Sequence, residues 1–159
     1  ANIERLLKPP VNAQTIYVLN IFPPSLTPRY YNKPWVIKAV LDSIVNHFNN
    51  NLNQDIEKLK KKYPHAKIHL VPVADWLSLI ALPQKGFSAQ LFPMAKRGLA
   101  CQADAFKHKQ DYSREPTPQN NCMGYLFWNA VHPSMETHQI IAYELEKLIE
   151  KNNSEGKSI

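Results

Sequence analysis

The chain has 159 residues, 44% of them apolar, and a formal net charge of +6 at pH 7. This length and apolar content are sufficient for one domain with its own core. No run of eighteen apolar residues occurs and no signal-peptide pattern opens the chain, so a membrane-spanning helix is excluded. Because the chain starts at Ala1 rather than at Met, we expect a processed, trimmed or partial protein.

The positive charge is concentrated in a lysine cluster formed by Lys58, Lys60, Lys61 and Lys62. Such a cluster is typical of the solvated end of a helix, and we expect no nucleic-acid partner. Weak attraction to an anionic lipid surface, and with it a peripheral membrane contact, suits this charge better.

The first part of the chain predicts a short helix, a strand and a rigid loop. Residues 3–7 have the pattern of a helix end, closed by two prolines. Residues 16–21 form an apolar run rich in β-formers, typical of a strand buried on both faces. The proline-rich residues 22–28 then predict a rigid loop.

A long amphipathic helix is predicted between Pro34 and Tyr63, because Pro34 suits a first-turn position and a proline follows the last residue. His47, near its middle, suits a flanking residue better than a metal ligand. Apolar residues recur along this helix at three- and four-residue steps, and such an apolar stripe needs a sheet or another helix to cover it. Its members are Val36, Val40, Ile44, Phe48, Leu52, Ile56 and Leu59.

Residues 68–73 predict a second strand, and residues 75–81 a short helix with Asp75 as its cap. Alternating strands and helices are typical of a parallel α/β sheet with right-handed crossovers. The aromatic and methionine side chains of residues 86–99 suit either the core or an acyl-binding surface, and we expect the core. A last helix is predicted over residues 135–151, followed by a flexible tail, residues 152–159.

Residues 124–130 predict a third, short strand, followed by a loop that carries His132. Pro133 excludes helix just before it, and Ser134 is a good N-cap for the last helix. His132 is therefore expected in an extended loop between a strand end and a helix start. That place suits a catalytic imidazole, although a surface histidine on a connecting loop is the alternative.

The only two cysteines, Cys101 and Cys122, enclose a polar segment without clear periodicity, residues 101–122. We expect a disulfide that closes this loop, stabilises the fold by about 3 kcal/mol and holds the His132 loop against the body. Such a bridge favours a secreted or periplasmic protein, whereas two free thiols in a cytosolic protein are the alternative.

Residues 127–134 read Phe-Trp-Asn-Ala-Val-His-Pro-Ser, with Thr-His-Gln at 137–139. This stretch resembles the last motif block of the GDSL/SGNH hydrolases. The branch it resembles most contains bacterial phospholipase A, thermolabile haemolysin and glycerophospholipid–cholesterol acyltransferase. The family block reads Phe-Trp-Asp-x-x-His-Pro-Thr, with Asp and His as members of a Ser-His-Asp triad. Here His132 holds the histidine position and Asn129 the position of the aspartate.

The resemblance is specific over residues 124–142 and looser, though collinear, from about residue 14. It implies a flavodoxin-like, three-layer α/β SGNH fold, of which residues 1–151 form the C-terminal half of one domain. Residues 22–28 resemble the family segment that leaves the C-terminal edge of the central sheet near the active site. No serine follows Gly-Asp in this chain. The nucleophilic serine is therefore expected on an N-terminal half outside it.

The function implied by the resemblance is that of a secreted serine esterase acting on lipid acyl esters, a phospholipase A or lysophospholipase that also transfers acyl groups. His132 would be the general base. An amide at Asn129 does not stabilise an imidazolium as a carboxylate does, and it can hold the wrong imidazole tautomer. Three interpretations stay open: a natural variant with residual activity, a deliberate inactivation, or an acid from elsewhere, with Asp104 and Asp111 as substitutes.

Other sites are not indicated by the sequence. No His-x-x-x-His pair lies on a predicted helix, no Cys-x-x-Cys occurs, and only four glycines are present, so we expect no metal and no cofactor. A secreted, non-catalytic binding module on an esterase-like scaffold is the alternative function. With two clear strands and a short third one, the chain is expected to leave a large apolar face open or covered by another chain.

Overall fold

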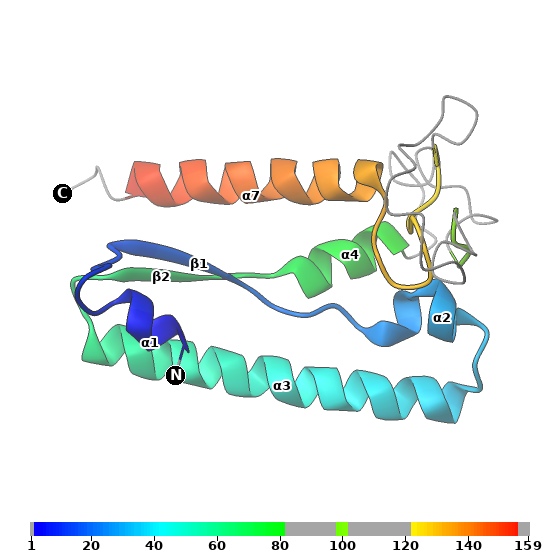
Figure 1. Cartoon of the computed structure of the whole chain (residues 1–159), viewed down its shortest axis with the longest axis horizontal. Coiled ribbons are helices and arrows are strands. Elements are labelled where there is room, and N and C mark those ends of the chain that lie inside the picture. The colour runs from blue at the N-terminus through cyan, green and yellow to red at the C-terminus, as the bar shows by residue number, and fades with distance from the viewer. Residues whose placement is uncertain (1, 82–97, 102–121, 156–159) are drawn as a thin grey trace.

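The computed structural model describes residues 2–81, 98–101 and 122–155 (Figure 1). These residues form a mixed helical and parallel-sheet arrangement, which confirms the α/β class. In chain order the elements are α1 (Asn2–Leu6), β1 (Thr15–Leu19), η1 (Pro24–Leu26), α2 (Pro28–Tyr31), α3 (Trp35–Lys62), β2 (Lys67–Val71), α4 (Val73–Ala81) and α7 (Met135–Glu155).

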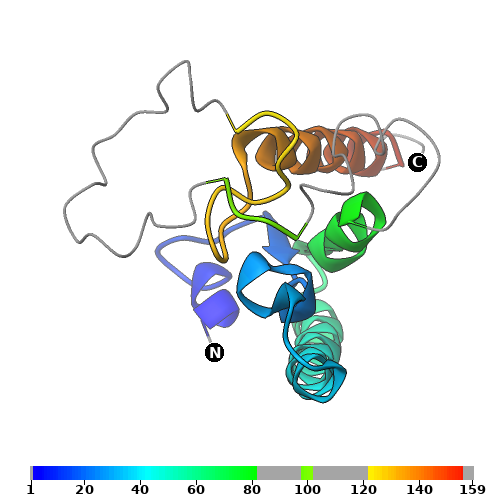
Figure 2. The same cartoon turned by 90° about the vertical axis from the view of Figure 1, so that its right-hand side faces the viewer.

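The sheet consists of β1 and β2, which pair in parallel with Ile16 opposite Ile68 and Tyr17 opposite His69. Helix α3 makes the crossover between them, as the alternating sequence pattern predicts. Helices α3 and α7 run along opposite sides of the sheet (Figures 1 and 2). Within the described ranges, every helix is too short or too polar to cross a bilayer.

The core is divided into two clusters of buried apolar side chains. One lies between α3 and the sheet and is centred on Leu7, Ile56, Ala66 and Ile68. The other lies at the far end of β2, where α4 meets the segment after Cys122; it contains Leu77, Ile80, Leu126 and Phe127. The second cluster places the segment that carries His132 on the end of the parallel sheet.

The apolar stripe of α3 is covered at one end only. Ile56 is fully buried, whereas Ile44 is 61% exposed and Val40 is 56% exposed. Four residues turn a helix by roughly 40° more than a full turn, so a row of four-residue steps winds around the axis. From Val36 to Ile56 the row therefore turns by roughly 200°, and its first half points away from the sheet. The sequence pattern shows one stripe, but the helix presents it in two directions.

The end of β1 is exposed in the same way. Leu19 is 51% exposed and Ile21 is 45% exposed, and the rest of β1 is half-buried at most. The prediction that this strand is buried on both faces is wrong in the described residues, because each residue of β1 is either exposed or only partly buried. Exposed apolar side chains therefore lie on the first half of α3 and at the end of β1, and a single open face that joins them stays a prediction.

The predicted third strand is also wrong for the described structure. Residues 124–130 form turns and bends, and Phe127 makes two isolated bridges, one parallel to Ala100 and one antiparallel to Pro133. The chain reverses between Phe127 and Pro133, and neither bridge extends into a ladder in the described residues.

Helix α4 begins at Val73, two residues earlier than predicted, and Asp75 lies in its first turn instead of capping it. The Asn20 side chain, at the end of β1, takes the capping role by accepting from Ala74 N at 2.8 Å. A cap from a distant strand leaves no local signal in the sequence, which is why Asp75 was the natural assignment.

Helix α7 extends to Glu155, so the predicted tail is wrong for residues 152–155, whereas residues 156–159 lie outside the described part. No proline or glycine occurs between Met135 and Gly156, so no helix-breaking residue ends the helix at Lys151. Its predicted inward side chains are all half-buried: Ile140, Ile141, Leu145, Leu148 and Ile149.

A histidine lies within the sheet. His69 stacks on Tyr17 with ring centroids 4.9 Å apart. Its Nε2 is buried and has no hydrogen-bond partner in the described residues. Burial lowers the pKa of His69 below its ordinary value, and the positive charges of Lys60 and Lys67 lower it further.

The two ends of the α3 stripe provide a matched stability test. We expect Ile56→Ala to lower the free energy of unfolding by about 2–5 kcal/mol, because it leaves a cavity. Ile44→Ala should cost less than about 1 kcal/mol, because that side chain is mostly in water. Urea unfolding of both variants, followed by circular dichroism, measures the difference. Equal costs in this chain would contradict an uncovered first half of α3.

His69 should make the fold sensitive to acid. The pKa of His69 is lower in the folded state than its ordinary value of about 6.5. When the pH falls through about 6.5, the unfolded chain therefore binds more protons than the folded chain, and the free energy of unfolding decreases. His69→Phe should flatten this part of the profile of unfolding free energy against pH. His65→Gln, at an exposed position, serves as the control. A His69→Phe profile as steep as that of the wild type would exclude this role.

Candidate functional site

The candidate site is the loop between Leu126 and Ser134. Ser134 N donates to Leu126 O at 3.0 Å, and Trp128 N donates to His132 O at 2.8 Å. Two antiparallel backbone bonds therefore close the base of the loop and present its tip, residues 129–131. These two backbone bonds hold the His132 backbone in the loop without involving a side chain.

Two buried hydroxyl groups fasten this loop to the start of α7. Ser134 Oγ accepts from Thr137 N at 3.2 Å, which confirms Ser134 as the N-cap. Thr137 Oγ1 donates to Leu126 O at 2.7 Å and lies 3.1 Å from Ser134 Oγ. Ser134 is 1% exposed and Thr137 is fully buried. The hydroxyl of Ser134 is thus committed to structure, which argues against a nucleophilic role for it.

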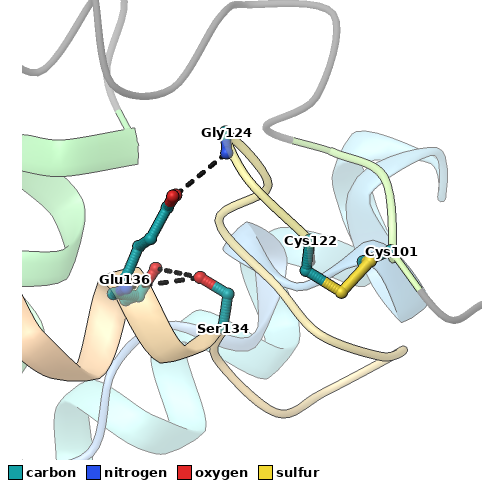
Figure 3. Close-up of a disulfide and its surroundings, with 6 residues drawn as sticks. Cys101, Cys122, Gly124, Ser134 and Glu136 are labelled. Carbon is teal, nitrogen blue, oxygen red and sulfur yellow. Dashed lines mark hydrogen bonds between the residues drawn. A yellow bond between two sulfur atoms is a disulfide. The ribbon is translucent and has the colours of Figure 1, made fainter. Parts of the chain in front are cut away.

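The predicted disulfide joins Cys101 and Cys122 (Figure 3). Cys101 N also donates to Phe127 O at 3.1 Å, so the bridge and the backbone hold the same two segments together. Gly124 has a φ of 76°, a left-handed conformation that favours glycine, and its N donates to Glu136 Oε2 at 2.9 Å (Figure 3). The disulfide and the bond from Gly124 to Glu136 restrict the conformation of the chain segment that leads into the His132 loop.

The proline-rich segment after β1 lies beside the loop, as predicted. Arg29 N, in the first turn of α2, donates to Ala130 O at 3.0 Å. The Phe22 ring lies 6.3 Å from the Phe127 ring, between centroids, in a tilted arrangement. Residues about a hundred positions apart in the sequence therefore form one site at the end of β1.

Asn129 is the centre of the loop. It is 1% exposed, and its Oδ1 accepts from Val131 N at 3.0 Å and from His132 N at 2.8 Å. The same oxygen lies 3.0 Å from Nδ1 of the exposed His132 ring. An imidazole with one nitrogen held by a buried oxygen and its body at the surface is suited to proton transfer.

His138 lies outside the loop tip. His138 is exposed on α7, and its Nδ1 lies 2.9 Å from Ser134 O, which is a structural role. The substitutes Asp104 and Asp111 lie outside the described residues, as does most of the segment 86–99. The described part of the chain contains no group of three or more His, Cys, Asp or Glu residues that could hold a metal ion.

The sequence motifs do not predict the contacts of Thr137 and Glu136. The signal for Thr137 was present, because a capping residue is often paired with a polar side chain three positions later. Glu136 bonds to a backbone N–H twelve residues earlier, and no local pattern predicts such a contact.

No protein-family model, no curated protein and no solved structure matches this chain. The resemblance to GDSL/SGNH hydrolases therefore stays a prediction.

The hydroxyl frame can be tested by substitution. Thr137→Val keeps the shape of the side chain but removes the bond to Leu126 O, so we expect a loss of about 1–3 kcal/mol in unfolding free energy. Ser154→Ala, which removes an exposed hydroxyl from the same helix, should stay within about 0.5 kcal/mol of the wild type. Denaturant unfolding of both variants gives the comparison. A Thr137→Val variant as stable as Ser154→Ala would show that the frame contributes little.

Proposed function

We propose that this chain is the C-terminal part of a secreted serine esterase that hydrolyses lipid acyl esters. The activity would be that of a phospholipase A or lysophospholipase, with acyl transfer as a further reaction. The observation that carries this proposal is the 3.0 Å contact between buried Asn129 Oδ1 and exposed His132 Nδ1. This contact has the geometry expected for the orienting half of a catalytic triad, at the positions given by the family motif.

In the proposed reaction His132 acts as general base through Nε2. It takes the hydroxyl proton of a serine as the serine oxygen bonds to the ester carbonyl carbon. The imidazolium then gives this proton to the leaving alcohol oxygen as the ester C–O bond breaks, which leaves an acyl-serine. A water molecule, deprotonated by the same nitrogen, releases the fatty acid and restores the serine. Transfer to an alcohol in place of water gives the acyltransferase reaction.

The serine of this proposal belongs to an N-terminal half that adds flavodoxin-like SGNH strands to the two strands of the described residues. Two observations support such a partner. The strand β1 has one neighbour in the described residues, and the first half of α3 leaves Val40 and Ile44 more than half exposed. Parallel sheets are normally covered on both faces, and exposed apolar surfaces of this kind mark contacts with further polypeptide.

The secreted location and the lipid substrate have separate supports. The disulfide is consistent with a secreted or periplasmic protein. The substrate class comes from the resemblance, and the net charge of +6 favours contact with an anionic lipid surface. No cofactor enters the proposed reaction.

A non-catalytic binding module is the second candidate, and one observation favours it: the triad acid is replaced by Asn129. Such a module would keep the loop for its stability and would not need the basicity of His132. The two candidates therefore differ in the expected effect of a His132 substitution: it lowers an esterase activity in the first and has no activity to affect in the second.

The test compares two histidines six residues apart. In the protein that joins this chain to a segment with a Gly-Asp-Ser block, His132→Ala should lower kcat/KM for a p-nitrophenyl acyl ester by about 10²- to 10⁴-fold. His138→Ala should leave it nearly unchanged, because His138 contacts a backbone carbonyl outside the loop tip. Both variants should fold as the wild type does by circular dichroism.

Equal activity in the two variants would contradict the role of His132. A joined protein that folds but has no esterase activity, and does not react with a fluorophosphonate, would favour the binding module.

A further inference from the structure

We propose that Asn129 is a positioning residue of this reaction. Its amide is locked in one orientation by two backbone N–H groups. In that orientation it keeps the His132 proton on Nδ1 and the lone pair on Nε2. The catalytic consequence rests on the proposed function, whereas the state of the ring can be measured in this chain alone.

The orientation of the amide follows from its backbone partners. The oxygen and nitrogen of an asparagine amide have similar shapes, so their assignment must come from the hydrogen bonds. The atom called Oδ1 faces Val131 N at 3.0 Å and His132 N at 2.8 Å. A backbone N–H is always a donor, so the atom that faces both of them must be the oxygen. A reversed amide would point its NH2 group at two donors.

The tautomer of His132 follows from the orientation of the amide. The same oxygen lies 3.0 Å from His132 Nδ1, and a carbonyl oxygen only accepts, so Nδ1 carries the hydrogen. A neutral imidazole has one N–H, which leaves the lone pair on Nε2. In serine proteases an Asp-to-Asn change lowers turnover about 10⁴-fold by holding the wrong tautomer. The sequence suggested the same risk here, and the two backbone donors remove it.

The other end of the amide shows how strongly this orientation is preferred. Asn129 Nδ2 is buried and has no hydrogen-bond partner in the described residues, a state that costs about 1–3 kcal/mol. Reversal of the amide could relieve at most one unpaired donor and would leave two backbone N–H groups without an acceptor. The loop therefore tolerates an unpaired Nδ2 because the alternative is worse.

What Asn129 cannot supply is negative charge. A carboxylate at this position would stabilise the imidazolium that forms when His132 takes a proton, whereas a neutral amide oxygen stabilises it less. Asn129→Asp keeps an oxygen toward all three donors and removes the unpaired Nδ2–H2. It should therefore preserve the tautomer and improve catalysis.

The first arm of the test measures the ring in the chain as it exists. Long-range ¹H–¹⁵N correlation spectra of the ¹⁵N-labelled protein at pH 8 should show His132 with the hydrogen on Nδ1, both in the wild type and in Asn129→Asp. Asn129→Ala should show a mixture of the two tautomers. A wild-type His132 with its hydrogen on Nε2 would overturn the proposal, and so would an Asn129→Ala spectrum identical to that of the wild type. If Asn129→Ala does not fold, the wild-type spectrum decides alone.

The second arm measures catalysis in the protein that includes the serine. Asn129→Asp should raise kcat for a p-nitrophenyl ester by about 10- to 100-fold and leave KM nearly unchanged. An unchanged or lower kcat would overturn the catalytic part of the proposal. If the first arm gives the expected tautomer but no variant has esterase activity, the proposed function fails while the locked imidazole stands.

Discussion

The site depends on one buried oxygen that lies at hydrogen-bond distance from three nitrogen atoms. Asn129 Oδ1 accepts from two consecutive backbone amides and lies at hydrogen-bond distance from the His132 ring. The two backbone bonds shape the loop, and the third contact orients the imidazole, so the same atom shapes the loop and, in the proposed reaction, positions the general base. A side chain with an oxygen at this place is required by the loop itself, whether or not it is charged.

The surroundings of this oxygen hold it in place from three directions. The hydroxyl groups of Ser134 and Thr137 join the loop to the start of α7. The disulfide between Cys101 and Cys122 restrains the chain just before it. The first turn of α2 bonds to the loop tip. Rigid support of this kind keeps a catalytic group within the narrow range of useful geometries.

Much of this architecture could be predicted from the sequence, because strong local signals govern it. The β-rich runs gave both strands, the span between two prolines gave α3, and Ser134 gave the start of α7. The predictions failed where distant residues decide. Asn20 caps α4 from the end of β1, and Phe127 makes isolated bridges to Ala100 and Pro133 in place of the predicted third strand. The sequence also does not predict which end of the α3 stripe is buried, because this depends on how the helix lies against the sheet.

The proposed N-terminal half would explain two features: it would cover the exposed apolar side chains of α3, and it would bring the nucleophilic serine to the exposed His132. The most direct measurement is the distance from His132 Nε2 to the nearest serine Oγ in a crystal structure of the joined protein. We expect about 2.6–3.2 Å to a serine on a strand-to-helix turn of the added half, with Val40 and Ile44 buried in the same structure. A His132 ring that faces solvent, with no serine within reach, would contradict the central claim.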